Sequence, residues 1–214
     1  MNKPGIILIG GGGHCKSVID VVEAENKFRI IGILDREENV GKTVLGYPIT
    51  GTDESIDKWC REGMSFHITL GQIKNWEVRY KIYKRLKALD AVLPVICSPS
   101  AYVSKHARIE EGTVIMHQAI VNADAHVGVN CIINNNALIE HDALIGEHSH
   151  ISTSATINGD CRLGGFCFVG SNSVLIQGIS IGENCIIGAG TVITKSWLKN
   201  KTIVGNPGNE IKGA

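Results

Sequence analysis

Histidines and carboxylates gather in the second half of the chain, where their types and spacing could support proton transfer or metal binding. Five of the eight histidines lie within 34 residues, and they are His117, His126, His141, His148 and His150. His141 stands between two carboxylates in the run Glu140-His141-Asp142. A histidine can accept a proton near neutral pH, and three histidines with a water molecule can hold a catalytic zinc ion. The residues alone leave both chemistries open.

A second candidate site lies near the N-terminus, where glycines occupy positions 10 to 13 and His14 follows. The apolar run before them predicts a buried strand, and the apolar stripe after them predicts a helix. Backbone amides at such a helix N-terminus bind phosphate oxygens, and Asp35, after the next predicted strand, can accept hydrogen bonds from a ribose or base. The pattern predicts a nucleotide site. Because Cys15 replaces the third glycine of a full dinucleotide fingerprint, we do not expect a dehydrogenase.

Sixteen six-residue repeats run without interruption from Val103 to Leu198. The first position of all sixteen is aliphatic, and the fifth position is small in fourteen. Hexads of this kind build a parallel β-helix, in which three short strands make one coil of eighteen residues. Four of the seven cysteines occupy the small fifth position, which predicts buried core residues and not reactive thiols. Trp197, Leu198 and residues 203–208 are expected to close the C-terminal end of the β-helix.

Residues 1–97 follow a different pattern, in which strands expected at 6–9, 29–35 and 66–71 alternate with helices. This alternation predicts a small parallel sheet, an α/β Rossmann-like half domain. The predicted helix stripes are Val18, Ile19 and Val22 in the first helix, and Val78, Ile82, Leu86 and Leu89 in a later one. We therefore expect a Rossmann-like nucleotide-sugar-binding domain at 1–97, followed by an all-β left-handed parallel β-helix at 98–214.

Composition narrows the classes of partner. The chain has 21 basic and 21 acidic residues, so no basic excess would draw it to nucleic acid or to an anionic membrane. The N-terminal apolar run is too short for a signal peptide or a membrane span, which predicts a cytoplasmic protein. The seven cysteines form no CxxC pair and cannot all pair within one chain, so neither a disulfide framework nor a zinc knuckle is expected.

The whole chain resembles the bacterial nucleotide-sugar N-acetyltransferases of the sialic acid O-acyltransferase type, which are hexapeptide-repeat acyltransferases. The resemblance depends on the glycine run ending in His14, on the uninterrupted hexads and on the local match from Glu140 to Gly159. It implies a left-handed β-helix, a homotrimer and acetyl-CoA as co-substrate. It further implies a nucleotide-linked 4-amino-4,6-dideoxy sugar as acceptor, in polysaccharide or glycoprotein assembly. The sequence does not choose between uridine, guanosine and thymidine.

The same resemblance implies roles for individual residues. His141 would be the general base and Asp142 its orienting acid. Acetyl-CoA would contact Asn134, His150, Gly159, Gly170 and Ala189, with the Gly159 amide stabilising the oxyanion. The nucleotide-sugar would contact Gly12, Gly13, His14, Asp35, Arg36, Gly71 and Gln72. The sugar amine would attack the thioester directly, with no acyl-enzyme and no metal.

Two alternatives remain open. A sialic acid O-acetyltransferase would use the same machinery with a hydroxyl nucleophile. A zinc-dependent β-helix enzyme of the carbonic anhydrase type would use three of the clustered histidines. The nucleotide-type domain has no use in the zinc enzyme, and the long C-terminal helix usual in that family is missing from the sequence.

Overall fold

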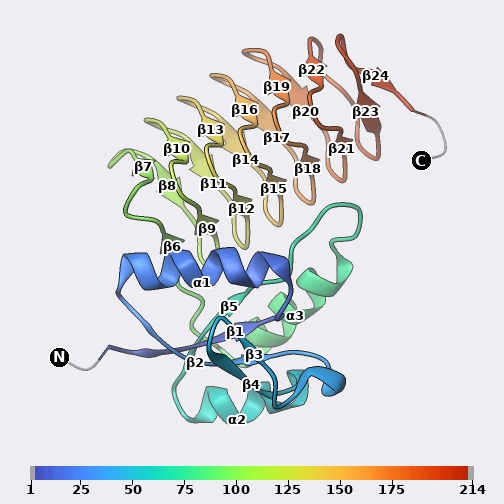
Figure 1. Ribbon diagram of the computed structural model, residues 1–214. Helices are drawn as coiled ribbons and strands as arrows, with labels where there is room; N and C mark the ends of the chain where they lie inside the picture. The colour runs from blue at the N-terminus through green and yellow to red at the C-terminus, as the bar shows by residue number, and fades with distance from the viewer. Residues whose placement is uncertain (1–2, 212–214) are drawn as a thin grey trace. The chain divides into compact units, whose positions relative to one another are not determined.

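The computed structural model describes residues 3–211, and the chain divides into two compact units, Met1–Cys97 and Ser98–Ala214. The first unit is a five-stranded sheet in the order β3-β4-β2-β1-β5, with helices on its faces (Figure 1). Its strands are β1 (Gly5–Ile9), β2 (Arg29–Leu34), β3 (Thr43–Val44), β4 (Tyr47–Gly51) and β5 (Ser65–Ile68), and β6 (Ile96–Cys97) ends the unit. Its helices are α1 (Gly13–Glu25), α2 (Ile56–Arg61) and α3 (Glu77–Ala88), with 3₁₀ turns η1 (Glu37–Asn39) and η2 (Asp53–Ser55).

The sheet of the first unit is mixed, so the prediction of an all-parallel sheet is wrong at one edge. Strands β4, β2, β1 and β5 are parallel, whereas β3 pairs antiparallel with β4. Leu45 and Gly46 join the two strands and both have positive φ, 47° and 86°, which is the backbone of a tight two-residue hairpin. A leucine is unusual in this conformation, so the sequence carried no hairpin signal.

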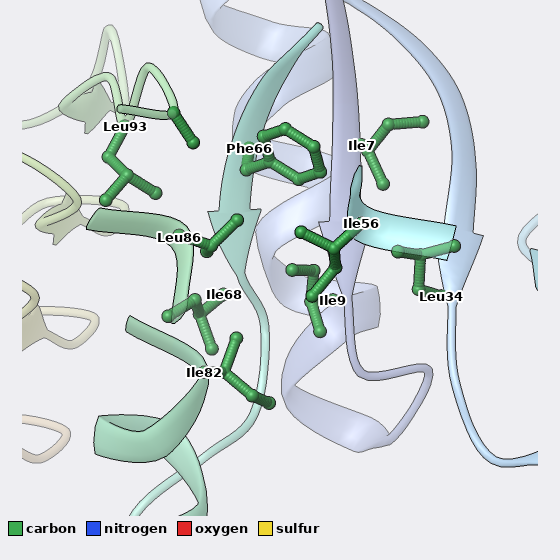
Figure 2. Packing of buried hydrophobic residues seen from close by; sticks show 10 residues of the cluster. Ile7, Ile9, Leu34, Ile56, Phe66, Ile68, Ile82, Leu86 and Leu93 are labelled. Atoms are coloured by element: carbon green, nitrogen blue, oxygen red, sulfur yellow. The ribbon is translucent and has the colours of Figure 1, made fainter. Parts of the chain in front are cut away.

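The core of the first unit lies on both faces of β1. Ile7 and Ile9 point to one face, where they join Phe66 and Ile68 of β5 and residues of α2 and α3 (Figure 2). One position of the predicted α3 stripe is wrong, because the Val78 side chain is 57% exposed. The buried position belongs instead to Arg79, whose guanidinium donates to the carbonyl of Leu70 at 3.0 Å.

The second unit is a parallel β-helix with three faces, numbered here in chain order (Figure 1). Face 1 contains β7 (Tyr102–Val103), β10 (Ile120–Val121), β13 (Leu138–Ile139), β16 (Thr156–Ile157), β19 (Val174–Leu175) and β22 (Val192–Ile193). Face 2 contains β8 (Arg108–Ile109), β11 (His126–Val127), β14 (Leu144–Ile145), β17 (Arg162–Leu163) and β20 (Ser180–Ile181). Face 3 contains β9 (Val114–Ile115), β12 (Ile132–Ile133), β15 (His150–Ile151), β18 (Phe168–Val169), β21 (Ile186–Ile187), β23 (Thr202–Val204) and β24 (Asn209–Glu210).

The predicted fold class, a Rossmann-like half domain followed by a left-handed β-helix, is confirmed, and the register shows the predicted repeat of the second unit. Each strand from β7 to β22 pairs in parallel with strands eighteen residues away, as in Val121 with Val103 and Ile139. The aliphatic first positions and small fifth positions point into the coil, and most are completely buried. The closing segment differs from expectation at Leu198, which is 80% exposed, while the antiparallel pair β23–β24 buries Ile203.

The corners between faces depend on a left-handed residue at the fourth position of the hexad. This position has positive φ in nearly every hexad, and its residues are Gln118, Asp124, Asn130, Asn136, Asp142, His148, Ser154, Asp160, Phe166, Asn172 and Asn184, with glycine at 112, 178 and 190. Asparagine and aspartate tolerate this conformation because their short polar side chains can bond locally. The fourth position therefore turns each strand into the next face.

Candidate functional site

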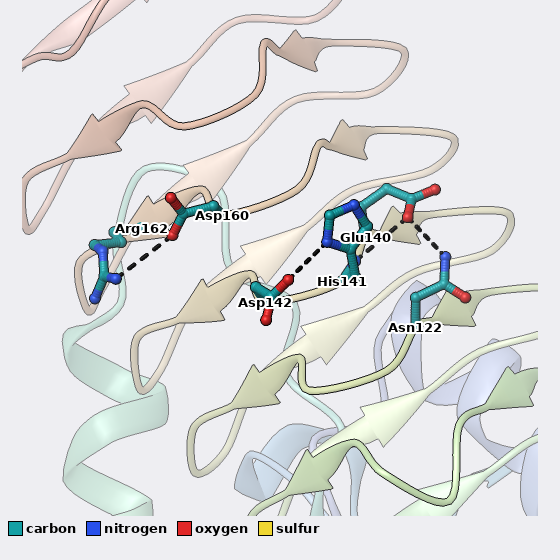
Figure 3. Close-up of polar contacts among 6 residues, drawn as sticks. All are labelled: Asn122, Glu140, His141, Asp142, Asp160 and Arg162. Carbon is teal, nitrogen blue, oxygen red and sulfur yellow. Dashed lines mark hydrogen bonds and ion pairs between the residues drawn. The ribbon is translucent and has the colours of Figure 1, made fainter.

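His141 and Asp142 lie at the corner between faces 1 and 2, and their side chains are in contact (Figure 3). The Nδ1 atom of His141 is 2.7 Å from Oδ2 of Asp142. Neighbouring side chains meet in this way because Asp142 has φ of 61°, so the corner turns both to the same side. With Nδ1 donating to the carboxylate, Nε2 has a free lone pair. Both side chains are more than half exposed, so Nε2 is accessible.

The electrostatic surroundings of His141 favour its protonated form. The hydrogen bond to Asp142 is the main cause that raises the pKa of His141, and the charges of Glu140 and Asp160 add to it. An imidazole in such surroundings is a stronger base than a free histidine. The pair can therefore accept a proton from a nucleophile and stabilise the imidazolium that forms.

Gly159 lies directly beside the His141 ring, one coil further along the chain. A Cβ atom built on Gly159 would be 2.7 Å from Cε1 and 2.8 Å from Nε2 of His141, so only glycine leaves room for the imidazole. Within the described part of the chain, the Gly159 amide donates to no acceptor, while the amides of Asn158 and Asp160 on either side do. A free backbone donor thus stands next to the histidine.

Sequence reasoning missed three polar residues around this pair, which are Asn122, Asp160 and Arg162. Asn122 donates from Nδ2 to Oε2 of Glu140 at 2.9 Å, and the same oxygen accepts the His141 backbone amide at 3.3 Å (Figure 3). The Asp160 backbone amide donates to the His141 carbonyl at 3.1 Å, and its carboxylate accepts from Arg162 at 3.5 Å. The eighteen-residue offset could have identified these neighbours, because it places Asn122 beside Glu140, Asp160 beside Asp142 and Arg162 beside Leu144.

The residues expected to contact acetyl-CoA gather mostly at another corner, between faces 3 and 1. Asn134 Nδ2 lies 3.2 Å from Nε2 of His150, and the His150 ring packs edge-on against Phe168 with centroids 5.3 Å apart. Gly170 and Ala189 lie further along this corner, where a Cβ on Gly170 would be 2.5 Å from the Ala189 amide nitrogen. Beyond Asn134, the residues Gly170 and Ala189 therefore add little side-chain volume along this corner.

One chain does not bring the two predicted groups together. The Asn134 corner precedes strand β13 and the His141 corner follows it, so the groups lie at opposite edges of face 1. Gly159 is the exception, since it contacts His141. The catalytic and cofactor roles of these residues stay predictions.

The first unit has a cleft of about 410 Å³ at the carboxyl ends of its parallel strands. Its lining residues are Ile9, Gly10, Leu34, Asp35, Arg36, Glu37, Thr52, Asp53, Glu54, Leu70, Val78 and Ile82. Asp35 is held by backbone amides, since Gly11 donates to Oδ2 at 3.1 Å and Arg36 donates to Oδ1 at 2.8 Å. Ligands of open α/β sheets bind at this edge, where strand carboxyl ends meet.

The glycine loop adjoins the start of α1, with Gly12 as its N-cap. No atom within the described residues would lie within 4 Å of a Cβ on Gly12 or Gly13, so the space above both is open. A Cβ atom built on Gly71 would be 3.7 Å from the Cβ of His14, which places these two predicted residues together. Gln72 is different, because its side chain is buried and does not reach an open surface.

Within a single chain, the five clustered histidines lie apart from one another. His117, His126, His141, His148 and His150 occupy different corners and faces of the coil. Between residues 3 and 211, no three side chains of His, Cys, Asp or Glu are grouped to hold a metal ion. The same stretch has no helix of the length and hydropathy needed to cross a membrane.

Comparison with known proteins identifies relatives of both units. The PglD N-terminal domain family matches residues 5–86, and the hexapeptide repeat of succinyl-transferase matches residues 162–195. UDP-N-acetylbacillosamine N-acetyltransferase of Bacillus subtilis is 34% identical over 115 residues, which are 52% of this chain and 50% of that protein. The aligned segment thus spans about half the length of this curated relative.

Solved structures also match nearly the whole chain. Perosamine N-acetyltransferase of Caulobacter crescentus, in complex with CoA and GDP-perosamine, has a TM-score of 0.90 and 29% identity, with 97% of each chain covered. The acetyltransferase domain of PglB of Neisseria gonorrhoeae, in complex with acetyl coenzyme A, has a TM-score of 0.91 and 29% identity, with 98% of this chain and 100% of that domain covered. The predicted resemblance to hexapeptide-repeat nucleotide-sugar N-acetyltransferases is therefore confirmed, and the chain matches the PglD N-terminal domain and the hexapeptide repeat in its two units.

Proposed function

We propose that this protein transfers the acetyl group of acetyl-CoA to the amine of a nucleotide-linked 4-amino-4,6-dideoxy sugar. The observation that carries the proposal is the arrangement of His141, whose Nδ1 is bound by Asp142 while Nε2 is exposed beside the free Gly159 amide. This arrangement provides a general base and an oxyanion donor within one small region. The related proteins described above act on amino sugars or bind CoA, which supports the same reaction.

The reaction needs one proton acceptor and no covalent intermediate. The sugar amine attacks the thioester carbonyl, Nε2 of His141 takes the amine proton, and the Gly159 amide donates to the developing oxyanion. The C–S bond then breaks, and the imidazolium returns the proton to the CoA thiolate as it leaves. The four cysteines of the coil, Cys131, Cys161, Cys167 and Cys185, are unsuited to acyl transfer because their side chains are completely buried.

Acetyl-CoA would lie along the corner between faces 3 and 1. Asn134 and His150 would hold the thioester end of acetyl-CoA. The small residues Gly170 and Ala189 would leave room for its extended pantetheine arm. Coils are about 4.8 Å apart, so these residues form a continuous row of about 14 Å along the coil axis.

A trimer would bring the acetyl-CoA row and His141 together. The outward residues of face 1 are Tyr102, Ile120, Leu138, Thr156, Val174 and Val192, which form an apolar row with one polar member. Tyr102 is 60% and Ile120 is 39% exposed in the single chain. If face 1 packs around a threefold axis, its His141 edge meets the Asn134 edge of the next protomer. We therefore propose three equivalent sites, each completed by two copies of the chain.

The nucleotide would bind in the cleft of the first unit. Its phosphates would contact the loop at Gly12, Gly13 and His14, where first-turn amides of α1 lack intrahelical acceptors. Its ribose would contact Asp35. Since both substrates are small cytoplasmic metabolites, we place the enzyme in the cytoplasm, serving polysaccharide or glycoprotein assembly.

The direct test is thiol release from acetyl-CoA with UDP-, GDP- and dTDP-linked 4-amino-4,6-dideoxy sugars. We expect turnover on one member of this panel and a loss of about 10²–10⁴-fold in His141→Ala, because a positioned general base contributes that much. His106→Ala removes an exposed histidine elsewhere in the β-helix and should leave turnover unchanged. Acetylation of free sialic acid alone, or equal activity in His141→Ala, would overturn the proposal.

A further inference from the structure

The cleft of the first unit has an acidic rim and apolar walls. Four carboxylates line it, from Asp35, Glu37, Asp53 and Glu54, against one cation, Arg36, within the described lining. The apolar lining includes Leu70 and Val78, and the exposure of Val78 that breaks the α3 stripe places an isopropyl group in the cleft. Apolar walls suit the flat faces of a nucleobase, while a carboxylate rim suits hydrogen-bond donors on its edge.

Asp53 is the rim carboxylate that is best placed to meet the base. The Asp35 amide donates to the Gly51 carbonyl at 3.0 Å, so Asp53, two residues further, stands beside Asp35 at the sheet edge. Both carboxylate oxygens of Asp35 already accept hydrogen bonds from backbone amides. We therefore assign Asp35 to a ribose hydroxyl and not to the base. Asp53 begins η2, and within residues 3–211 its carboxylate makes no hydrogen bond or ion pair.

The charged groups that act on Asp53 are Asp35, which follows β2, and two basic residues of α3. Removal from water is the largest cause that raises the pKa of Asp53, and the charge of Asp35 adds to it. Arg85 and Lys81 of α3 act in the opposite direction. A carboxylate at the mouth of a cleft can accept a pair of donated hydrogen bonds, and hydrogen bonds to a charged acceptor are stronger than neutral ones.

Bases differ in what their pairing edges present to a carboxylate. Guanine offers N1–H and N2–H side by side, and these two donors match the two oxygens of one carboxylate. Uracil and thymine present one N–H between two carbonyl oxygens, and those oxygens would face the acidic rim. Adenine and cytosine each pair an amino group with a ring-nitrogen acceptor.

We propose that the cleft selects guanine, with the Asp53 carboxylate accepting from N1–H and N2–H of a guanosine diphosphate-linked sugar. This inference rests on the proposed function, because it concerns the base of the same nucleotide-sugar. It makes Asp53 the residue that determines nucleotide specificity, although sequence reasoning assigned it no role.

Calorimetric binding of GDP, IDP and UDP to the full chain tests the inference without acetyl transfer. IDP differs from GDP only by the missing N2 amine. We expect IDP to bind about 10- to 100-fold more weakly than GDP, since one hydrogen bond to a charged group is lost. UDP should bind at least as weakly as IDP.

The variant Asp53→Asn should abolish the difference between GDP and IDP. It should also improve binding of XDP, whose 2-oxo group can accept from the new amide. Glu38→Gln is the matched control, since Glu38 is a carboxylate of the neighbouring turn that does not line the cleft, and it should keep the GDP preference.

The outcomes separate the two proposals. Equal binding of GDP and IDP by the wild-type chain, or tighter binding of UDP, would overturn the role of Asp53 and leave the acetyltransferase proposal standing. Failure of every nucleoside diphosphate to bind would remove the nucleotide site on which both proposals depend. The wild-type comparison needs no variant, so it decides the question even if the Asp53→Asn protein folds poorly.

Discussion

At the scale of single residues, the proposed reaction makes the hydrogen bond between His141 and Asp142 the contact that sets the pH range of activity. His141 must be neutral to accept a proton, and the bond to Asp142 raises the pKa of His141. Removing the charge with Asp142→Asn should therefore move the acidic limb of the kcat/KM profile to lower pH. The rate on the plateau should fall by less than in His141→Ala, because the imidazole itself remains. A limb at the same pH in both proteins would show that Asp142 does not act on the base.

His67 is a buried residue whose protonation opposes folding. It lies in β5, and burial, followed by the charge of Arg79, lowers the pKa of His67 to about 3. The unfolded chain binds a proton at this side chain near pH 6.5, whereas the folded chain does not, so folding stability is lost as the pH falls from 6.5 towards 3. The loss from this residue amounts to about 1.4 kcal/mol per pH unit.

Urea unfolding between pH 4.5 and 7.5 tests this effect, followed by tryptophan fluorescence because Trp59 and Trp76 lie in the same unit. In His67→Leu the free energy of unfolding should depend less steeply on pH below 6.5. His106→Leu, at an exposed position, should keep the wild-type slope. Parallel curves for all three proteins would contradict the assignment.

At the scale of elements, the corners of the β-helix depend on residues that accept positive φ. Asn172 is exposed and has φ of 57°, and its side chain makes no hydrogen bond among the described residues. Asn172→Val should lower the free energy of unfolding by about 1–2 kcal/mol, because a β-branched side chain is strained in the left-handed region. Asn172→Gly should be nearly neutral. Denaturation curves that rank valine equal to glycine would argue against the corner geometry.

The elements also show what the sequence could and could not predict. The β-helix was predictable because one rule, repeated every six residues, decides both the interior and the corner. The first unit was less predictable. The Leu45–Gly46 hairpin, and the burial of Arg79 where Val78 was expected to be buried, arise from tertiary contacts that no local pattern reports. The His141–Asp142 contact needed the left-handed turn at Asp142, which becomes visible only when the corner is built.

At the scale of the whole molecule, the proposed trimer makes activity dependent on association. A charge on the apolar row of face 1 should prevent packing about the threefold axis, because it would be buried without a partner. Ile120→Glu should therefore give monomers in light scattering after gel filtration, with acetyl transfer lost. Its GDP binding should be retained, since the cleft lies within one unit. Ser180→Glu, at an exposed outward position of face 2, is the matched surface control and should remain trimeric.

The eighteen-residue register of the β-helix restricts how the length of this domain can change. Every strand from β7 to β22 pairs with residues eighteen positions away, so one inserted residue would turn all later aliphatic side chains out of the interior. Removal of one complete coil would preserve pairing, corners and core. The domain can therefore lengthen or shorten only by whole coils, so the length of its acetyl-CoA row would change in steps of about 4.8 Å.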